Sequence, residues 1–222
     1  MQLKRQNFEI IKKGYNAQAK GGLNPRLTES TLFLWQSISA NKSQYVFDPL
    51  ENASQAADEL RLNINDEFTV TQFGVFLYGK VQDQANASDT KQLLTEMPFE
   101  LLAAGQSLKA ANLWAGAADI LVNNIKYVEK YDLRKHNMAG FGRLTTNGNT
   151  AFDFSKDGMD ELAPMVTLSG AKKNQININL PDSLASFTFN VVGATQTMTY
   201  TIDKIAVVMR GLNAQNAAKF QG

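Results

Sequence analysis

The 222-residue sequence contains no cysteine, one histidine and five prolines, and its formal net charge is only +1. Without cysteine the chain forms no disulfide and offers no thiolate, so we expect a fold held by packing alone. A net charge near zero gives no overall field that would draw the protein to nucleic acid or to a membrane. No apolar run approaches the roughly 20 residues that span a bilayer. The basic N-terminal residues precede no apolar h-region, so we expect no secretory signal and folding in a cytoplasm.

The groups that carry most enzyme chemistry are also scarce. His136 is the only histidine and lies next to Lys135, and we interpret it as a solvated loop residue. One histidine cannot supply the several ligands of a cupin metal centre. The sequence has no nucleophile elbow, phosphate-binding loop or complete dinucleotide fingerprint. We interpret Asp66 and Glu67 as capping a turn rather than as an acid/base pair. We therefore predict a protein without enzymatic activity, metal or cofactor.

Short apolar segments of the kind that form strands run through most of the chain. Ile176 and Ile178 alternate with asparagines, which is the period of a strand buried on one face. In residues 68–78 the alternation gives way after Gln72 to a nearly continuous apolar run, which is typical of a strand covered on both faces. Turn residues separate the segments at steady spacing. The pattern predicts an all-β sandwich rather than a βαβ fold, with one inserted helix near 98–109.

Two pairs of segments resemble each other at a nearly constant offset. Residues 68–79 and 200–211 each begin with an aromatic residue, continue through an apolar run and end in glycine. Residues 42–49 and 173–181 form the second pair. Repeats at a fixed spacing indicate duplicated units, so we predict two consecutive jelly-roll sandwiches of unequal length. The predicted units are an N-terminal basic arm over 1–20, a first jelly roll over 21–132 and a second jelly roll over 133–222.

The arm combines basic charge with apolar residues at spacings compatible with one face of a short helix. Two interpretations stay open. The arm is either a surface helix docked on the body, or a segment that contacts an anionic layer of lipid headgroups or nucleic acid. The residues assigned to a membrane or inner-face contact are Lys4, Arg5, Phe8, Lys12 and Lys13.

Two consecutive sandwiches behind a basic arm, in a cysteine-free chain, resemble the double jelly-roll major capsid proteins of tailless icosahedral bacteriophages with an internal membrane. The resemblance is closest to the FLiP-like phages of Flavobacterium. Residues 65–77 (NDEFTVTQFGVFL) are similar to a strand of the first roll in such proteins. Residues 168–181 (LSGAKKNQININLP) are similar to a strand-turn-strand of the second roll. The resemblance covers most of residues 25–212.

The resemblance implies a structural protein of the virion capsid that is assembled in the cytoplasm of a bacterial host. Three chains with two rolls each would close into a homotrimer of pseudo-hexagonal outline, and these trimers would tile an icosahedral shell. The implied partners are further copies of the chain, penton and minor capsid proteins, and the internal viral membrane. The basic arm would meet the lipid phosphates of that membrane. No sequence-specific contact with nucleic acid is implied.

Two other functions fit the sequence. A carbohydrate-binding sandwich module would expose Trp35, Trp114 or Tyr45 as stacking platforms, although the apolar neighbours of these residues favour core packing. A minor capsid, spike or tail protein would belong to a virion in a different stoichiometry. Oligomeric state separates the first alternative from a shell protein, and copy number in the particle separates the second.

Overall fold

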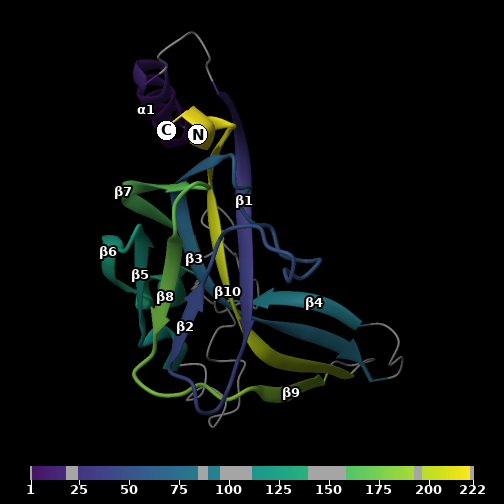
Figure 1. Cartoon of the computed structure of the whole chain (residues 1–222). Coiled ribbons are helices and arrows are strands. Elements are labelled where there is room, and N and C mark those ends of the chain that lie inside the picture. Colours follow the sequence, from purple (N-terminus) through teal and green to yellow (C-terminus); the bar gives the residue numbers. More distant parts are fainter. Residues whose placement is uncertain are drawn as a thin grey trace.

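The computed structural model describes residues 2–18, 25–84, 90–95, 112–139, 159–192 and 197–220. These residues are mostly β-strand, in two antiparallel sheets that face each other as in a sandwich (Figure 1). The all-β class predicted from the sequence is therefore confirmed. The main helical elements are α1 (Gln2–Gln18), α3 (Arg134–Ala139) and the 3-10 helix η2 (Ala217–Phe220). The strands are β1 (Arg26–Ser37), β2 (Gln44–Phe47), β3 (Glu67–Asp83), β4 (Thr90–Thr95), β5 (Ala117–Val122), β6 (Ile125–Asp132), β7 (Asp160–Ser169), β8 (Asn174–Asn179), β9 (Phe187–Val192) and β10 (Thr197–Gln215).

Six strands form the larger sheet, in which β10 lies between β1 and β3. Two strands share the other edge of β3: β7 pairs with its first half and β4 with its second half. β9 pairs with the first residues of β10, and Figure 1 shows β4 and β9 extending away from the smaller sheet. The smaller sheet has four strands in the order β2–β8–β5–β6.

The hydrophobic core lies between the inner faces of the two sheets. Phe68 and Phe73 of β3 and Ile176 and Ile178 of β8 are all fully buried there. The isoleucines of β8 alternate with half-buried residues, so the predicted period of two is confirmed. Burying a side chain of this size contributes about 1.5–3 kcal/mol, so the core between the sheets is the main source of stability.

The segments that look like repeats in the sequence are neighbouring strands of the same sandwich. β3 pairs with β10, with Val75 opposite Val207, and β2 pairs with β8, with Tyr45 opposite Ile178. β3 and β10 lie side by side in the middle of the larger sheet, and both have buried residues on their two faces. Adjacent strands in the same environment need the same kind of side chains. Shared burial therefore accounts for the similarity without a duplicated unit.

The double jelly roll divided near residue 132 is not confirmed. Each sheet joins strands from both predicted units, since β1 and β3 pair with β10 while β2 and β5 pair with β8. The described strands thus share one core between two sheets. A periodic pattern gives the environment of a strand but not its partner, which is why the sequence suggested two separate rolls. The helix predicted near 98–109 lies outside the described residues.

Candidate functional site

The predicted arm forms helix α1, which is docked on the outer face of the larger sheet near the start of β1 and the end of β10 (Figure 1). Residues three and four positions apart share one face of a helix, and this places Phe8, Ile11 and Tyr15 together. Ile11 is buried, while Phe8 and Tyr15 are half-buried. The apolar face expected from the sequence therefore points toward the body of the protein.

The residues predicted to contact a membrane divide between two sides of α1. Phe8 faces the sheet, whereas Lys12 and Lys13 are exposed to solvent. The Lys12 amine lies 5.9 Å from the centre of the Phe8 ring, within the range of a cation–π contact. Lys4 and Arg5 belong to the first turns of the same helix, but their side chains lie outside the described part of the structure. Membrane contact by this set stays a prediction.

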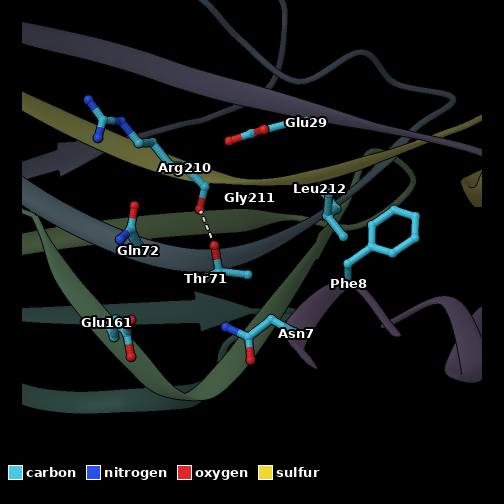
Figure 2. A pocket seen from close by; sticks show the side chains of 9 residues that line it. All are labelled: Asn7, Phe8, Glu29, Thr71, Gln72, Glu161, Arg210, Gly211 and Leu212. Carbon is cyan, nitrogen blue, oxygen red and sulfur yellow. Dashed lines mark hydrogen bonds between the residues drawn. The ribbon is translucent and has the colours of Figure 1, made fainter. Parts of the chain in front are cut away.

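A first hollow, here called the Phe8 hollow, lies between α1 and the larger sheet and has a volume of about 350 Å³ (Figure 2). Figure 2 shows Phe8 of α1 beside Leu212 of β10 at one end. The Thr71 hydroxyl donates a hydrogen bond to the carbonyl oxygen of Arg210 at 3.1 Å. Charges of both signs line the rest, so the hollow favours no particular ligand charge. The charged residues are Glu29, Glu161 and Arg210.

A second hollow, here called the Glu67 hollow, lies further along α1 and has a volume of about 390 Å³. Its floor is polar and comes from β3 and β7, where Glu67 and Ser169 are each only 2% exposed. The hydroxyl groups of Thr69 and Thr167 share a hydrogen bond of 3.0 Å beside them. Four oxygen-bearing side chains therefore line one small region of the sheet.

Tyr15 completes this polar group from the side of the helix. Its hydroxyl oxygen is buried and forms no hydrogen bond of normal geometry, although it lies close to Glu67 and Thr69. Burial and the negative charge of Glu67 raise the pKa of Tyr15 above its ordinary value. Both effects disfavour the charged form of Tyr15, and burial is the larger of the two.

The sequence contained part of the signal for this site. Residues two apart in a strand point to the same face, so Glu67 with Thr69, and Thr167 with Ser169, are same-face pairs that the sequence alone shows. The pairing of β3 with β7, which places Glu67 opposite Ser169, is not visible in the sequence. Glu67 directly follows the turn that ends at Asp66 and begins β3, but its place beside a turn did not indicate that its side chain is buried.

The interpretation of His136 as a solvated loop residue is wrong. His136 lies in α3 and is 0% exposed, with its ring 5.4 Å from that of Tyr131 and 5.9 Å from that of Phe73. The Tyr131 hydroxyl donates a 2.7 Å hydrogen bond to the Asp160 carboxylate. Burial and this carboxylate raise the pKa of Tyr131. The histidine is thus part of an aromatic cluster beside the core.

The aromatic residues considered as glycan platforms are mostly buried. Tyr45 is 0% and Trp114 only 2% exposed, so neither presents a ring to solvent. Trp35 is half-buried, and the Lys204 amine lies over its ring, 3.7 Å from the ring centre. Its indole N–H donates to the Asp58 carboxylate at 3.0 Å. Core packing, the preferred interpretation for these residues, holds for Tyr45 and Trp114.

Within the described residues, no three histidine, cysteine or acidic side chains gather closely enough to hold a metal ion. No helix in that same part of the chain has the length and apolar character needed to cross a membrane. No family model, curated protein or solved structure matches the sequence or the fold. Function is therefore argued from the geometry of the strands, of α1 and of the two hollows.

Proposed function

We propose that the chain is a structural subunit of a virus particle, built on a jelly-roll sandwich. The observation that carries this proposal is the strand order, β1–β10–β3–β7 in one sheet facing β2–β8–β5–β6 in the other. Eight antiparallel strands that fold through two Greek keys alternate between two sheets in this way. Jelly rolls build the shells of many viruses, and they also occur in lectins and cupins.

Two features favour the shell protein over the other jelly-roll functions. A cupin centre needs several histidine ligands, and the single histidine of this chain is packed in an aromatic cluster. A lectin needs exposed aromatic rings for stacking, and the burial of Tyr45 and Trp114 removes two of the three candidates. A shell protein needs only shape-matched flanks and protected strand edges.

The number of rolls per chain bears on the kind of shell subunit. A double jelly roll would give a homotrimer six rolls and hence the pseudo-hexagonal outline of a major capsid protein. The described strands support one roll per chain, and a homotrimer of single rolls has only three corners. This arrangement favours a minor capsid subunit as the second candidate, with the same partners in the particle.

The first experiment measures the solution mass of the full-length protein by light scattering after size exclusion. A closed ring of copies, each of 24.5 kDa, is expected, and negative-stain images should show its symmetry. A trimer with hexagonal outline supports the major capsid protein, and any other closed ring supports the minor one. A strict monomer at all concentrations and salt levels contradicts the proposal.

The same proposal assigns α1 to the inner side of the shell, facing lipid. Each exposed lysine contributes about 1 kcal/mol near an anionic surface, an effect multiplied over many copies. Reversing the charges with Lys12→Glu and Lys13→Glu should abolish co-sedimentation with phosphatidylserine vesicles. The matched control Lys173→Glu, at an exposed lysine of the β7–β8 turn, should leave it unchanged. Equal loss in both variants contradicts a role specific to α1.

A further inference from the structure

The Glu67 hollow buries more polar groups than its own hydrogen bonds satisfy. The Glu67 side chain is 2% exposed, and the described residues form no ion pair with it. The hydroxyl oxygens of Ser169 and Tyr15 are buried there without a hydrogen-bond partner among those residues. Proteins rarely bury hydroxyl groups without partners, because each loses its hydration on folding. A bound group that donates hydrogen bonds would satisfy both hydroxyl oxygens and would lie beside the buried Glu67 carboxylate.

The fold brings these polar groups together in one small region. β3 and β7 pair in a register that puts Glu67 opposite Ser169 and Thr69 opposite Thr167. The four side chains therefore form two adjacent rows on one face of the sheet, and α1 brings Tyr15 over them. A carboxylate accepts only, and each hydroxyl offers acceptor lone pairs. The polar floor is thus a set of oxygen acceptors around one negative charge.

The remaining walls are apolar and the mouth is open. Ile11 and Val122 are buried, and Met165 beside them is half-buried. Tyr127, which is 53% exposed, and Lys172, which is half-exposed, lie where the hollow meets solvent. A ligand that suits this shape carries a charged head for the floor and a short hydrocarbon stem for the walls.

We propose that the Glu67 hollow binds a primary ammonium group carried on a short alkyl chain. Such a head has three N–H donors and no acceptor, which matches one carboxylate and the surrounding hydroxyl oxygens. The methylene groups pack against Ile11, Val122 and Met165. A neutral sugar would leave the Glu67 charge uncompensated, and a quaternary ammonium would have no N–H for Ser169 or Tyr15. This ligand class goes beyond the proposed shell function and does not depend on it.

A substitution of Lys172 tests whether the ligand is a cation. Its amine lines the mouth of the hollow but forms no ion pair with Glu67. A positive charge at the mouth opposes entry of a cation and favours entry of an anion. Replacing it, as Lys172→Met, should therefore tighten binding of an ammonium ligand about two- to fivefold.

The experiment titrates the full-length protein with n-butylammonium chloride by isothermal calorimetry at constant ionic strength. Saturable binding with a Kd on the order of 1 mM is expected for a ligand of so few atoms. Glu67→Gln should weaken binding at least about tenfold, because the buried charge pair is lost. Ser169→Ala should weaken it by a few-fold. The matched control is Glu161→Gln, in the Phe8 hollow under the same helix, and it should not change the Kd.

Three results would overturn the proposal. They are the absence of saturable binding to the wild-type protein, an unchanged Kd in Glu67→Gln, and equal affinity for n-butyltrimethylammonium, which keeps the charge but lacks N–H donors. Circular dichroism establishes that each variant is folded. If Glu67→Gln fails to fold, the comparison of the two ammonium ligands on the wild-type protein and the Ser169→Ala variant decides the question.

Discussion

The two faces of the larger sheet are built from the same strands but differ in how they are filled. On the inner face Phe68 and Phe73 of β3 are fully buried against the smaller sheet. On the outer face, under α1, the same strand presents Glu67, Thr69 and Gln72 to hollows of about 350 and 390 Å³. The inner face is closely packed and stabilises the fold. The outer face leaves polar space, which is where a sandwich of this kind has room for a ligand.

Register shifts in the β3–β10 pairing keep the two faces distinct. The core residues of β3 are even-numbered up to Val70 and odd-numbered from Phe73 onward, and a register shift lies between Val70 and Gln72. An extra residue at a bulge reverses which side chains point inward. The bulge therefore turns Phe73 into the core and leaves Gln72 on the outer face, at the Phe8 hollow.

The largest expected difference between the faces comes from removing one phenyl ring from each. Phe73→Ala should destabilise the protein by about 3–5 kcal/mol, because it leaves a cavity in a closely packed core. Phe8→Ala should cost only about 1 kcal/mol, because that ring is half-buried beside an existing hollow. Urea denaturation followed by tryptophan fluorescence measures both values. Similar losses in the two variants would show that α1 is as much a part of the core as β3.

A smaller effect is expected from adding one methyl group to a glycine of each region. Gly211 lies at a register shift of the β3–β10 pair, where a β-carbon would collide with the carbonyl oxygen of Thr69. Gly211→Ala should therefore destabilise by about 1–3 kcal/mol. A β-carbon at Gly14, in α1, meets no atom within 4 Å. Gly14→Ala should stabilise by about 0.5–1 kcal/mol through helix propensity, and a calorimetric Tm that falls for both variants would argue against an open space beneath α1.

Strands β3 and β10 show which features could be predicted from the sequence and which could not. The apolar run that follows Gln72 correctly indicated a strand buried on both faces. The terminal glycines of the two similar segments, Gly79 and Gly211, both lie at register shifts of the β3–β10 pair. The shared burial of these segments in one sheet, however, accounts for their resemblance without a duplication. Periodicity depends on the environment of each strand, while the choice of partner depends on contacts far apart in the chain.

Local polarity was a poor guide to the burial of charged and titratable groups. Arg134 and Lys135 are exposed, and they suggested an exposed neighbour, but a helical step of about 100° per residue turns His136 to the buried side of α3. Glu67 follows a turn residue, yet the first position of β3 places its side chain under α1. In both cases residues adjacent in the sequence were a poor guide to burial, because burial depends on the residues that are adjacent in the folded structure.

The smallest predicted effect compares two tyrosines whose hydroxyl groups are shielded from solvent, the buried Tyr131 and the half-buried Tyr15. Tyr131 donates a 2.7 Å hydrogen bond to Asp160, whereas the Tyr15 hydroxyl in the Glu67 hollow has no hydrogen-bond partner among the described residues. Tyr131→Phe should therefore destabilise by about 1–2 kcal/mol at neutral pH, and Tyr15→Phe should be neutral or slightly stabilising. Thermal unfolding of both variants beside the wild type measures the difference.

The pH dependence of the stability lost in Tyr131→Phe tests whether the Asp160 carboxylate is the source of that loss. Burial tends to raise the pKa of Asp160, but hydrogen bonds from Tyr131 and Lys135 outweigh it and hold the pKa below its ordinary value of 3.8. A carboxylate whose pKa is lower in the folded state adds stability above pH 3.8, and this contribution is lost as the pH falls further. The stability difference between wild type and Tyr131→Phe should therefore be constant from pH 7 to about pH 5 and shrink below it. For Tyr15→Phe a smaller acid dependence is expected, because that hydroxyl lies close to the Glu67 carboxylate but forms no hydrogen bond of normal geometry with it. A stability loss in Tyr131→Phe that persists unchanged at low pH would assign the effect to the packing of the hydroxyl group and not to its hydrogen bond with the Asp160 carboxylate.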